Sequence, residues 1–180
     1  MTGRRAVFLD RDGVINRSIV REGKPFAPAT LAELEVLPGV PEALGRLRAA
    51  GYLLIVVTNQ PDVARGLQLR DTVEAMHAHL SSTLPLDAIR TCFDADDASA
   101  CRKPNPGLLV DAAVDFGVDL SRSVMVGDRW RDIEAGERAG CRTVFVDRGY
   151  RERRPERPDA VVGSLGEAAE WILLQGSEIT

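Results

Sequence analysis

Short apolar runs alternate with segments of helical periodicity along most of this chain, and this alternation restricts the possible folds more than any other feature. We expect five strands rich in Val, Ile, Leu and Phe, at residues 6–9, 53–57, 88–93, 124–126 and 143–146. Between them, apolar residues three and four positions apart predict helices. Strand–helix–strand units form right-handed crossovers, which make the strands parallel. The sequence therefore predicts an α/β fold: a doubly wound, mostly parallel sheet with helices on both faces.

Composition and length narrow the class of protein further. With 180 residues, of which 44% are hydrophobic and 28% charged, the chain is expected to form one domain over residues 1–180. A net charge of -4 argues against nucleic-acid or anionic-membrane binding. No apolar run approaches the roughly 20 residues that a membrane span needs. The odd count of three cysteines argues against a disulfide framework, and we expect a cytoplasmic protein.

Polar side chains follow directly after several of the expected strands. Asp10 and Asp12 come after residues 6–9, and in an open α/β sheet this edge is where ligands bind. Two carboxylates so close together repel each other unless a cation or phosphate chemistry makes use of them. A parallel sheet would bring further residues to the same edge: Thr58, Asn59, Gln60, Arg102, Lys103, Gly127, Asp128, Arg129 and Asp132.

This set of side chains suits the hydrolysis of a phosphomonoester. We expect Asp10 to attack phosphorus and form an aspartyl-phosphate. Asp12 would protonate the leaving alcohol and then activate the hydrolytic water. The hydroxyl of Thr58 and the ammonium group of Lys103 would hold the phosphoryl oxygens. Mg²⁺, which takes carboxylate and phosphate oxygens as ligands, would bind Asp10 and Asp128 and remove their repulsion.

In these four places the chain resembles the haloacid dehalogenase (HAD) superfamily of phosphatases. The matching motifs are D-x-D-G-V at residues 10–14, Thr58 after the second expected strand, Lys103, and G-D-x-x-x-D at residues 127–132. The resemblance implies a doubly wound sheet, an Asp10 nucleophile and an Asp12 acid/base. It also implies that Mg²⁺ is held by Asp10, the backbone carbonyl of Asp12, and Asp128.

Four further segments resemble the branch that contains heptose-bisphosphate phosphatases and histidinol phosphatases: residues 10–16, 58–60, 64–66 and 101–104. Members of that branch lack a large cap domain, which favours a monomer here. By resemblance, Asn59, Arg65, Arg102 and Arg129 are candidates for contacts with the substrate. We expect the substrate to be D-glycero-D-manno-heptose 1,7-bisphosphate, with removal of the 7-phosphate; histidinol phosphate or another small phosphomonoester is the alternative.

One departure from that branch concerns a zinc loop with the pattern Cys-x-His followed by Cys-x-Cys. Here Asp94 stands in place of the histidine and Ser99 in place of one cysteine, so only Cys92 and Cys101 remain. A structural zinc site wants four good donors, usually Cys or His. We therefore expect no zinc, and a loop held by packing or left mobile.

Several residues allow more than one interpretation. Asp132 could position Lys103 or cap a helix start, where a carboxylate is favoured. His77 and His79 are two positions apart on a predicted helix, so they point in different directions and make a poor metal pair. The arginine-rich segment 148–157 is interpreted as a solvated loop, and the long segment 16–38 as a lid or substrate wall.

Other functions are less well supported by these residues. A phosphorylated receiver domain also has a doubly wound sheet, but its acceptor aspartate would lie past a middle strand, with no second aspartate two residues later. A nucleic-acid 3′-phosphatase would need a basic groove with exposed aromatic residues, which the sequence does not indicate. A catalytically silent binding module would be expected to lack a motif residue, and none is missing.

Overall fold

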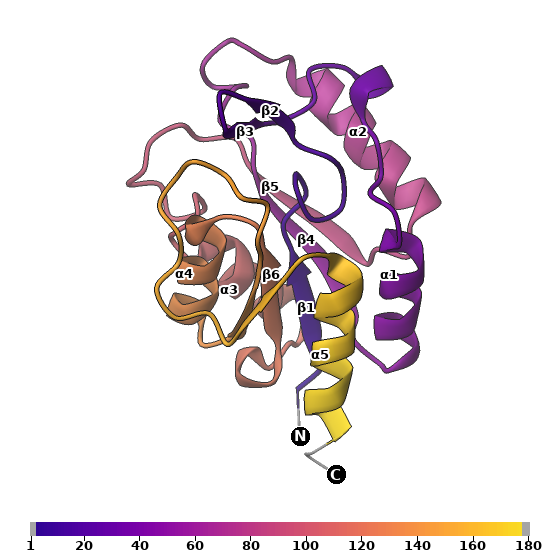
Figure 1. Ribbon diagram of the computed structural model, residues 1–180. Coiled ribbons are helices and arrows are strands. Elements are labelled where there is room, and N and C mark those ends of the chain that lie inside the picture. Colours follow the sequence, from indigo (N-terminus) through magenta and orange to yellow (C-terminus); the bar gives the residue numbers. More distant parts are fainter. Residues whose placement is uncertain (1–2, 178–180) are drawn as a thin grey trace.

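In the computed structural model, which describes residues 3–177, a parallel sheet runs through the centre of the molecule (Figure 1). Its six strands, in spatial order β5-β4-β1-β6-β7-β8, pair in parallel throughout. The strands are β1 (Ala6–Leu9), β4 (Leu53–Asn59), β5 (Ala88–Cys92), β6 (Val124–Gly127), β7 (Arg142–Val146) and β8 (Ala160–Val162). The predicted α/β class and the five predicted strands are confirmed. Strand β8 was not predicted, because three residues at a sheet edge are too few to show a period.

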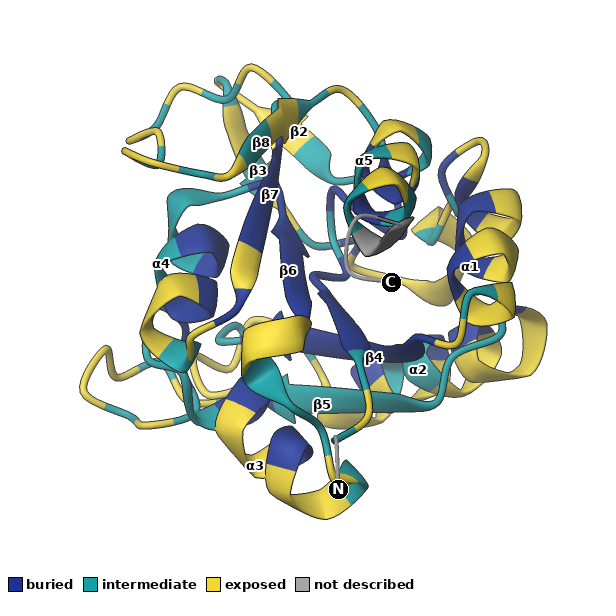
Figure 2. Ribbon diagram, turned by 90° about the horizontal axis from the view of Figure 1, so that it is seen from below, coloured by how far each residue is buried: buried dark blue, intermediate teal, exposed yellow. Residues whose placement is uncertain are grey.

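Helices cover both faces of the sheet (Figure 2). Successive side chains of a strand point to opposite faces: Val7 and Leu9 pack into one apolar cluster, and Ala6 and Phe8 into the other. The first cluster is shared with α1 (Val40–Ala49), α2 (Arg70–Thr83) and α5 (Leu165–Ser177). The second is shared with α3 (Gly107–Phe116) and α4 (Trp130–Ala139), which a short 3₁₀ turn at Leu120–Arg122 and strand β6 separate in the chain.

The position of α5 differs from the prediction. The apolar residues at 168–174 predict a short helix packed on the edge of the sheet. In the structure α5 lies instead over the face of the sheet beside α1, with Ala168, Ala169 and Ile172 buried in the first cluster. Two adjacent alanines allow the helix to approach the sheet closely, and this closes the core on that side. None of the helices in the described part of the chain is long and apolar enough to cross a membrane.

The segment 16–38, which showed no periodicity, contains a small hairpin. Strands β2 (Ile19–Arg21) and β3 (Lys24–Phe26) pair antiparallel, and a 3₁₀ turn follows at Leu31–Glu33. The two-residue turn has positive φ at Glu22 (53°) and Gly23 (79°), which is the geometry that matches the twist of a hairpin. The hairpin lies above the carboxyl end of β1 (Figure 1), where Lys24, Pro25 and Phe26 line a cavity. This placement fits the expected substrate wall.

Candidate active site

The Asp10 and Asp12 pair begins where β1 ends. The backbone N–H of Asp10 still donates to Val126 O at 3.0 Å, and the chain then turns sharply at Gly13, which has φ of 86°. A Cβ atom at Gly13 would collide with the carboxylate of Asp128. Only glycine therefore allows the turn after β1 to lie against the end of β6, and this close approach brings Asp128 to the aspartate pair.

Lys103 is a buried cation at the centre of the site, only 2% exposed. Its Nζ donates to Asp10 Oδ1 at 2.9 Å, to Asp132 Oδ1 at 2.7 Å and to Val57 O at 2.7 Å. Burial alone would lower the pKa of Lys103, but the two carboxylates outweigh it and raise the pKa well above its usual value. Lys103 therefore carries its charge throughout the physiological pH range.

Asn59, at the end of β4, holds the backbone of Lys103 at two points. Its Oδ1 accepts from Lys103 N at 3.1 Å, and its Nδ2 donates to Lys103 O at 3.0 Å. Asn59 also lines the cavity. Its amide group is occupied by Lys103, so it contributes to the site by placing the ammonium group, and the predicted contact of Asn59 with substrate stays a prediction.

Asp132 combines the two roles that the sequence left open. Its Oδ1 accepts from Lys103 Nζ, and its Oδ2 accepts from the backbone N–H of Arg129 at 3.0 Å, at the first turn of α4. One carboxylate thus positions the cation and caps a helix start, where negative charge is favoured.

The carboxylates of Asp10 and Asp128 are arranged to hold a cation. One oxygen each from Asp10, Asp128 and Asp132 lies within 4.8 Å of the others. Burial, followed by the charge of Asp132, raises the pKa of Asp10 to about 6, although Lys103 opposes the change. Burial and the charges of Asp10 and Asp132 likewise raise the pKa of Asp128 well above its usual value. A divalent cation would relieve this repulsion.

The carboxylate oxygens that have no hydrogen-bond donor within the described residues indicate which of these aspartates suit Mg²⁺. Both oxygens of Asp132 are occupied, by Lys103 and by the backbone of Arg129. Oδ2 of Asp128 accepts from the hydroxyl of Tyr150 at 2.8 Å, but its buried Oδ1 has no hydrogen-bond partner among residues 3–177. Such an oxygen needs a ligand, and carboxylate oxygens are what Mg²⁺ prefers. The residues present therefore fit the expected metal, with Asp10 and Asp128 as its carboxylate ligands.

Asp12 is held by donors on both of its oxygens. Arg11 donates to Oδ1 from Nε (3.1 Å) and Nη2 (2.9 Å), and Asn16 Nδ2 donates to the same oxygen at 2.9 Å. Gln60 Nε2 donates to Oδ2 at 2.9 Å. Burial would raise the pKa of Asp12, but the charge of Arg11 and these hydrogen bonds lower it below its usual value. Asp12 therefore rests as a carboxylate.

The cavity has a volume of about 450 Å³ and contains most of the predicted site residues. Asp10, Asp12, Lys103 and Asp128 line it, together with the predicted substrate contacts Asn59, Arg65, Arg102 and Arg129. Thr58 does not: it is buried behind Gln60, whose Nε2 donates to Thr58 Oγ1 at 3.0 Å. Lys24 and Arg131 also line the cavity, and neither was predicted from the sequence.

Each of the three predicted arginines already has an acidic partner. Arg65 pairs with Asp62 at 3.1 Å on the surface, and Arg129 pairs with Glu152 at 2.6 Å. Arg102 is buried and donates from Nε to Asp97 at 2.9 Å and from Nη1 to Asp94 O at 3.2 Å. The contacts of the buried Arg102 fix its guanidinium group at the cavity wall before any anion arrives, whereas the exposed Arg65–Asp62 pair holds its arginine only weakly.

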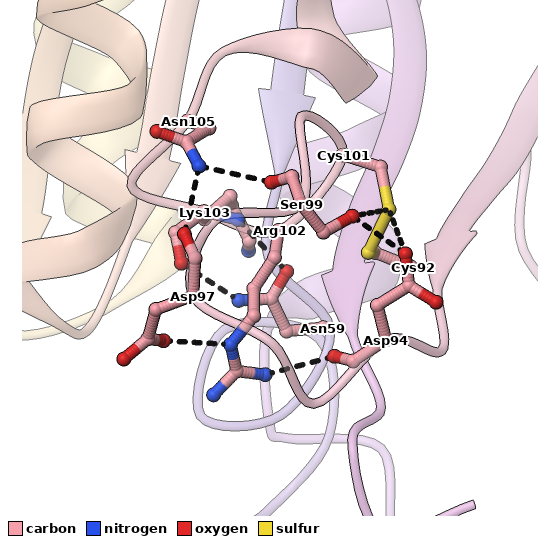
Figure 3. The surroundings of a disulfide bond; sticks show 9 residues. All are labelled: Asn59, Cys92, Asp94, Asp97, Ser99, Cys101, Arg102, Lys103 and Asn105. Carbon is pink, nitrogen blue, oxygen red and sulfur yellow. Dashed lines mark hydrogen bonds and ion pairs between the residues drawn. A yellow bond between two sulfur atoms is a disulfide. The ribbon is translucent and has the colours of Figure 1, made fainter. Parts of the chain in front are cut away.

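The loop between β5 and α3 corrects the expectation about cysteines. The odd count argued against disulfides, but Cys92 and Cys101 are joined by one (Figure 3), and Cys141 is free and buried. The loop returns to the end of β5, and this brings together two thiols that are nine positions apart in the sequence. A disulfide sulfur is not the thiolate that zinc binds. The disulfide also links the loop that carries Arg102 to the sheet.

Some residues of the site were missed by the sequence analysis. Tyr150 bonds Asp128, Arg148 Nε donates to Gly13 O at 2.8 Å, and Glu152 pairs with Arg129. The arginine-rich segment was interpreted as a solvated loop, but its first part borders the site. These residues follow β7 at the same carboxyl edge, and this position is the one signal in the sequence that places them near the site, although it does not give their partners.

Comparison with known proteins agrees with this fold and site. Residues 100–168 match the family described as HAD-hydrolase-like. The chain is 39% identical to D-glycero-D-manno-heptose-1,7-bisphosphate 7-phosphatase of Thermosynechococcus vestitus, over 94% of this chain and 95% of that protein. It is 38% identical to the β-anomer 7-phosphatase of Rhodopseudomonas palustris, over 76% of this chain and 80% of that one.

A solved structure gives the same result. The D,D-heptose 1,7-bisphosphate phosphatase of Bordetella bronchiseptica, complexed with magnesium and phosphate, superposes with a TM-score of 0.80 at 34% identity, covering 95% of this chain and 99% of that one. The chain therefore belongs to the HAD-like phosphatases, in the family of the heptose-1,7-bisphosphate 7-phosphatases.

Proposed function

We propose that this protein is a Mg²⁺-dependent phosphatase that removes the 7-phosphate of D-glycero-D-manno-heptose 1,7-bisphosphate through an aspartyl-phosphate on Asp10. The observation that carries the proposal is the contact of Asp10 with Lys103, within the same cavity as Asp12 and beside the buried oxygen of Asp128 that has no hydrogen-bond partner in the described part of the chain. The named relatives and the solved Bordetella structure support the substrate. We further propose a single domain over residues 1–180 and a cytoplasmic monomer.

In the first step, an oxygen of Asp10 bonds to phosphorus while the bond from phosphorus to the sugar oxygen breaks. The departing oxygen takes a proton from Asp12, and the sugar leaves as an alcohol. Asp12 is a carboxylate in the free site, but an arriving phosphate dianion raises its pKa, because a second negative charge nearby disfavours ionisation. Asp12 therefore takes up a proton from solvent as the substrate binds. Lys103 stays charged and holds Asp10 in line.

In the second step, Asp12 has returned to its carboxylate form and takes a proton from water, whose oxygen attacks phosphorus. The bond from phosphorus to Asp10 breaks and inorganic phosphate leaves, so Asp10 is regenerated. When Mg²⁺ is bound by Asp10, Asp128 and the backbone carbonyl of Asp12, it screens the anionic nucleophile from the anionic substrate. Thr58 accepts a hydrogen bond from Gln60, so its own hydroxyl proton would be available for a phosphoryl oxygen.

A substrate with two phosphates fits the distribution of cations. Lys103 lies at the reacting end, and Arg65, Arg102 and Arg129 lie on the cavity wall, where the guanidinium N–H groups that their acidic partners leave free can donate to a second phosphate. The relatives include phosphatases named for the α-anomer and for the β-anomer, so both are candidates.

The test is a phosphate-release assay with both anomers of the heptose bisphosphate and with histidinol phosphate. Asp10→Asn serves as the blank, and EDTA is added in a parallel series. We expect one heptose anomer to be turned over with the highest kcat/KM, and no release with Asp10→Asn or EDTA. Turnover of histidinol phosphate alone would replace the substrate assignment, and full activity of Asp10→Asn would refute the mechanism.

A further inference from the structure

Arg11, between the two predicted catalytic aspartates, is the largest fully buried side chain in the described part of the chain, with 0% exposure. A buried charge is costly unless it is paired and hydrogen-bonded. All three guanidinium nitrogens have partners: Nε and Nη2 donate to the carboxylate of Asp12, and Nη1 contacts Nε2 of His77 at 3.0 Å. Arg11 thus joins the aspartate pair to α2, which carries His77.

The contact with Arg11 fixes the chemical state of His77. A guanidinium group only donates hydrogen bonds, so Nε2 of His77 must accept. The proton of the neutral ring is then on Nδ1, which lies 3.4 Å from Thr91 Oγ1 on β5. Burial and the charge of Arg11 also lower the pKa of His77 to about 4. The ring is neutral, and its two nitrogens connect Arg11 to the sheet.

We propose that His77 is a positioning residue that acts through Arg11: it holds the guanidinium plane so that Asp12 faces the leaving oxygen of the substrate. Asn16 and Gln60 each give Asp12 one bond, from an amide, whereas Arg11 grips it with two nitrogens of a rigid plane. Without His77, the buried Nη1 of Arg11 loses its acceptor. We then expect the guanidinium group to rotate until Nη1 reaches a different acceptor. The inference rests on the proposed role of Asp12 as the general acid.

The leaving group of the substrate separates this role from a general loss of structure. A sugar alkoxide leaves slowly without a proton, whereas p-nitrophenolate leaves readily without one. We expect His77→Met to lower kcat for the heptose bisphosphate by about tenfold or more, part of the 100-fold to 10,000-fold that general acids contribute. The kcat for p-nitrophenyl phosphate should fall by less than about threefold, and KM should change little.

Three further variants control the comparison. His77→Gln keeps an acceptor oxygen for Arg11 and should recover most of the lost rate. His79→Met makes the same substitution two positions further along α2, where the residue is exposed, and should behave as the wild type. Thr91→Val removes the acceptor of the His77 proton with little change in volume. It should show the same selective loss of kcat with a smaller amplitude, and it replaces His77→Met in the test if that variant fails to fold.

A crystal structure of His77→Met or Thr91→Val gives a readout that does not depend on turnover. We expect the Arg11 plane to rotate and at least one of its bonds to Asp12 to be lost. Retention of all the Arg11–Asp12 bonds, or an equal fall in kcat for both substrates, overturns the positioning role while leaving the phosphatase assignment intact. A wild-type protein that releases phosphate from neither substrate overturns the proposed function, and the inference with it.

Discussion

Replacing Asp10 by asparagine should make the metal-free protein more stable at neutral pH, although it abolishes the nucleophile. Asp10 has a pKa of about 6 in the folded chain against a usual value of 3.8. A carboxyl group with this difference binds its proton more tightly when folded, so it stabilises the fold fully below pH 4. That contribution, about 3 kcal/mol, is lost as pH rises through 6. Asparagine stays neutral and keeps an oxygen to accept from Lys103.

The measurement is urea unfolding in EDTA, at about pH 4 and pH 7.5, of wild type, Asp10→Asn and Asp111→Asn. Asp111 is an exposed residue of α3, so its substitution controls for the loss of one negative charge. We expect Asp10→Asn to exceed the wild type by about 3 kcal/mol at pH 7.5 and to match it near pH 4. Added Mg²⁺ should narrow the gap by binding the wild type. A gap that is absent at pH 7.5, or equal at both pH values, would refute the electrostatic reasoning.

Three other perturbations have defined outcomes. Gly13→Ala should destabilise the protein by about 2–4 kcal/mol in thermal unfolding and abolish phosphate release. Gly51→Ala, at the same φ of 86° but in open space, should cost only about 1 kcal/mol and keep activity. Equal effects of the two substitutions would contradict the contact of Gly13 with Asp128. Tyr150→Phe should weaken Mg²⁺ activation about tenfold, because the hydrogen bond from Tyr150 lowers the pKa of Asp128. The effect should be larger at pH 6 than at pH 8. An unchanged Mg²⁺ titration would contradict this role of Tyr150. Reduction of the Cys92–Cys101 disulfide should lower the free energy of unfolding by about 2.5 kcal/mol, which is the chain-entropy value for so short a loop. The measurement is urea unfolding with and without reductant. No change would mean that packing alone holds the loop.

The sheet and the acidic centre of the site were predictable because each leaves a local mark in the sequence. A strand buried on both faces is a continuous apolar run, and the polar residues that follow it lie at the ligand-binding edge. Asp10, Asp12 and Asp128 follow such runs directly, so their meeting could be inferred without knowledge of any contact. Asp132 was harder to assign, because its two oxygens have different tasks.

The parts that were missed depend on distant partners. Arg11 looks like a surface charge in the sequence, because His77, which completes its hydrogen bonds in the fold, lies 66 positions away on α2. Tyr150 lies in a segment dominated by arginines, and its contact with Asp128 forms only when that segment folds back over the sheet edge. The three-residue strands β2 and β3 are too short to show alternation. No period or motif marks such contacts, because they arise from tertiary packing.

Because Asn59 binds the backbone of Lys103, the β5–α3 loop can place the catalytic lysine and contact the substrate through different residues. Asn59, on strand β4, fixes the backbone of Lys103, and Val57 O of the same strand accepts from its ammonium group. None of these contacts involves a side chain of the loop that precedes Lys103. We therefore expect that residues 93–100 can be exchanged or lengthened while the reacting end of the cavity keeps its geometry. Substrate preference can change in this loop without loss of the chemistry, and a library restricted to residues 93–100 would be the economical place to search for new phosphatase specificities.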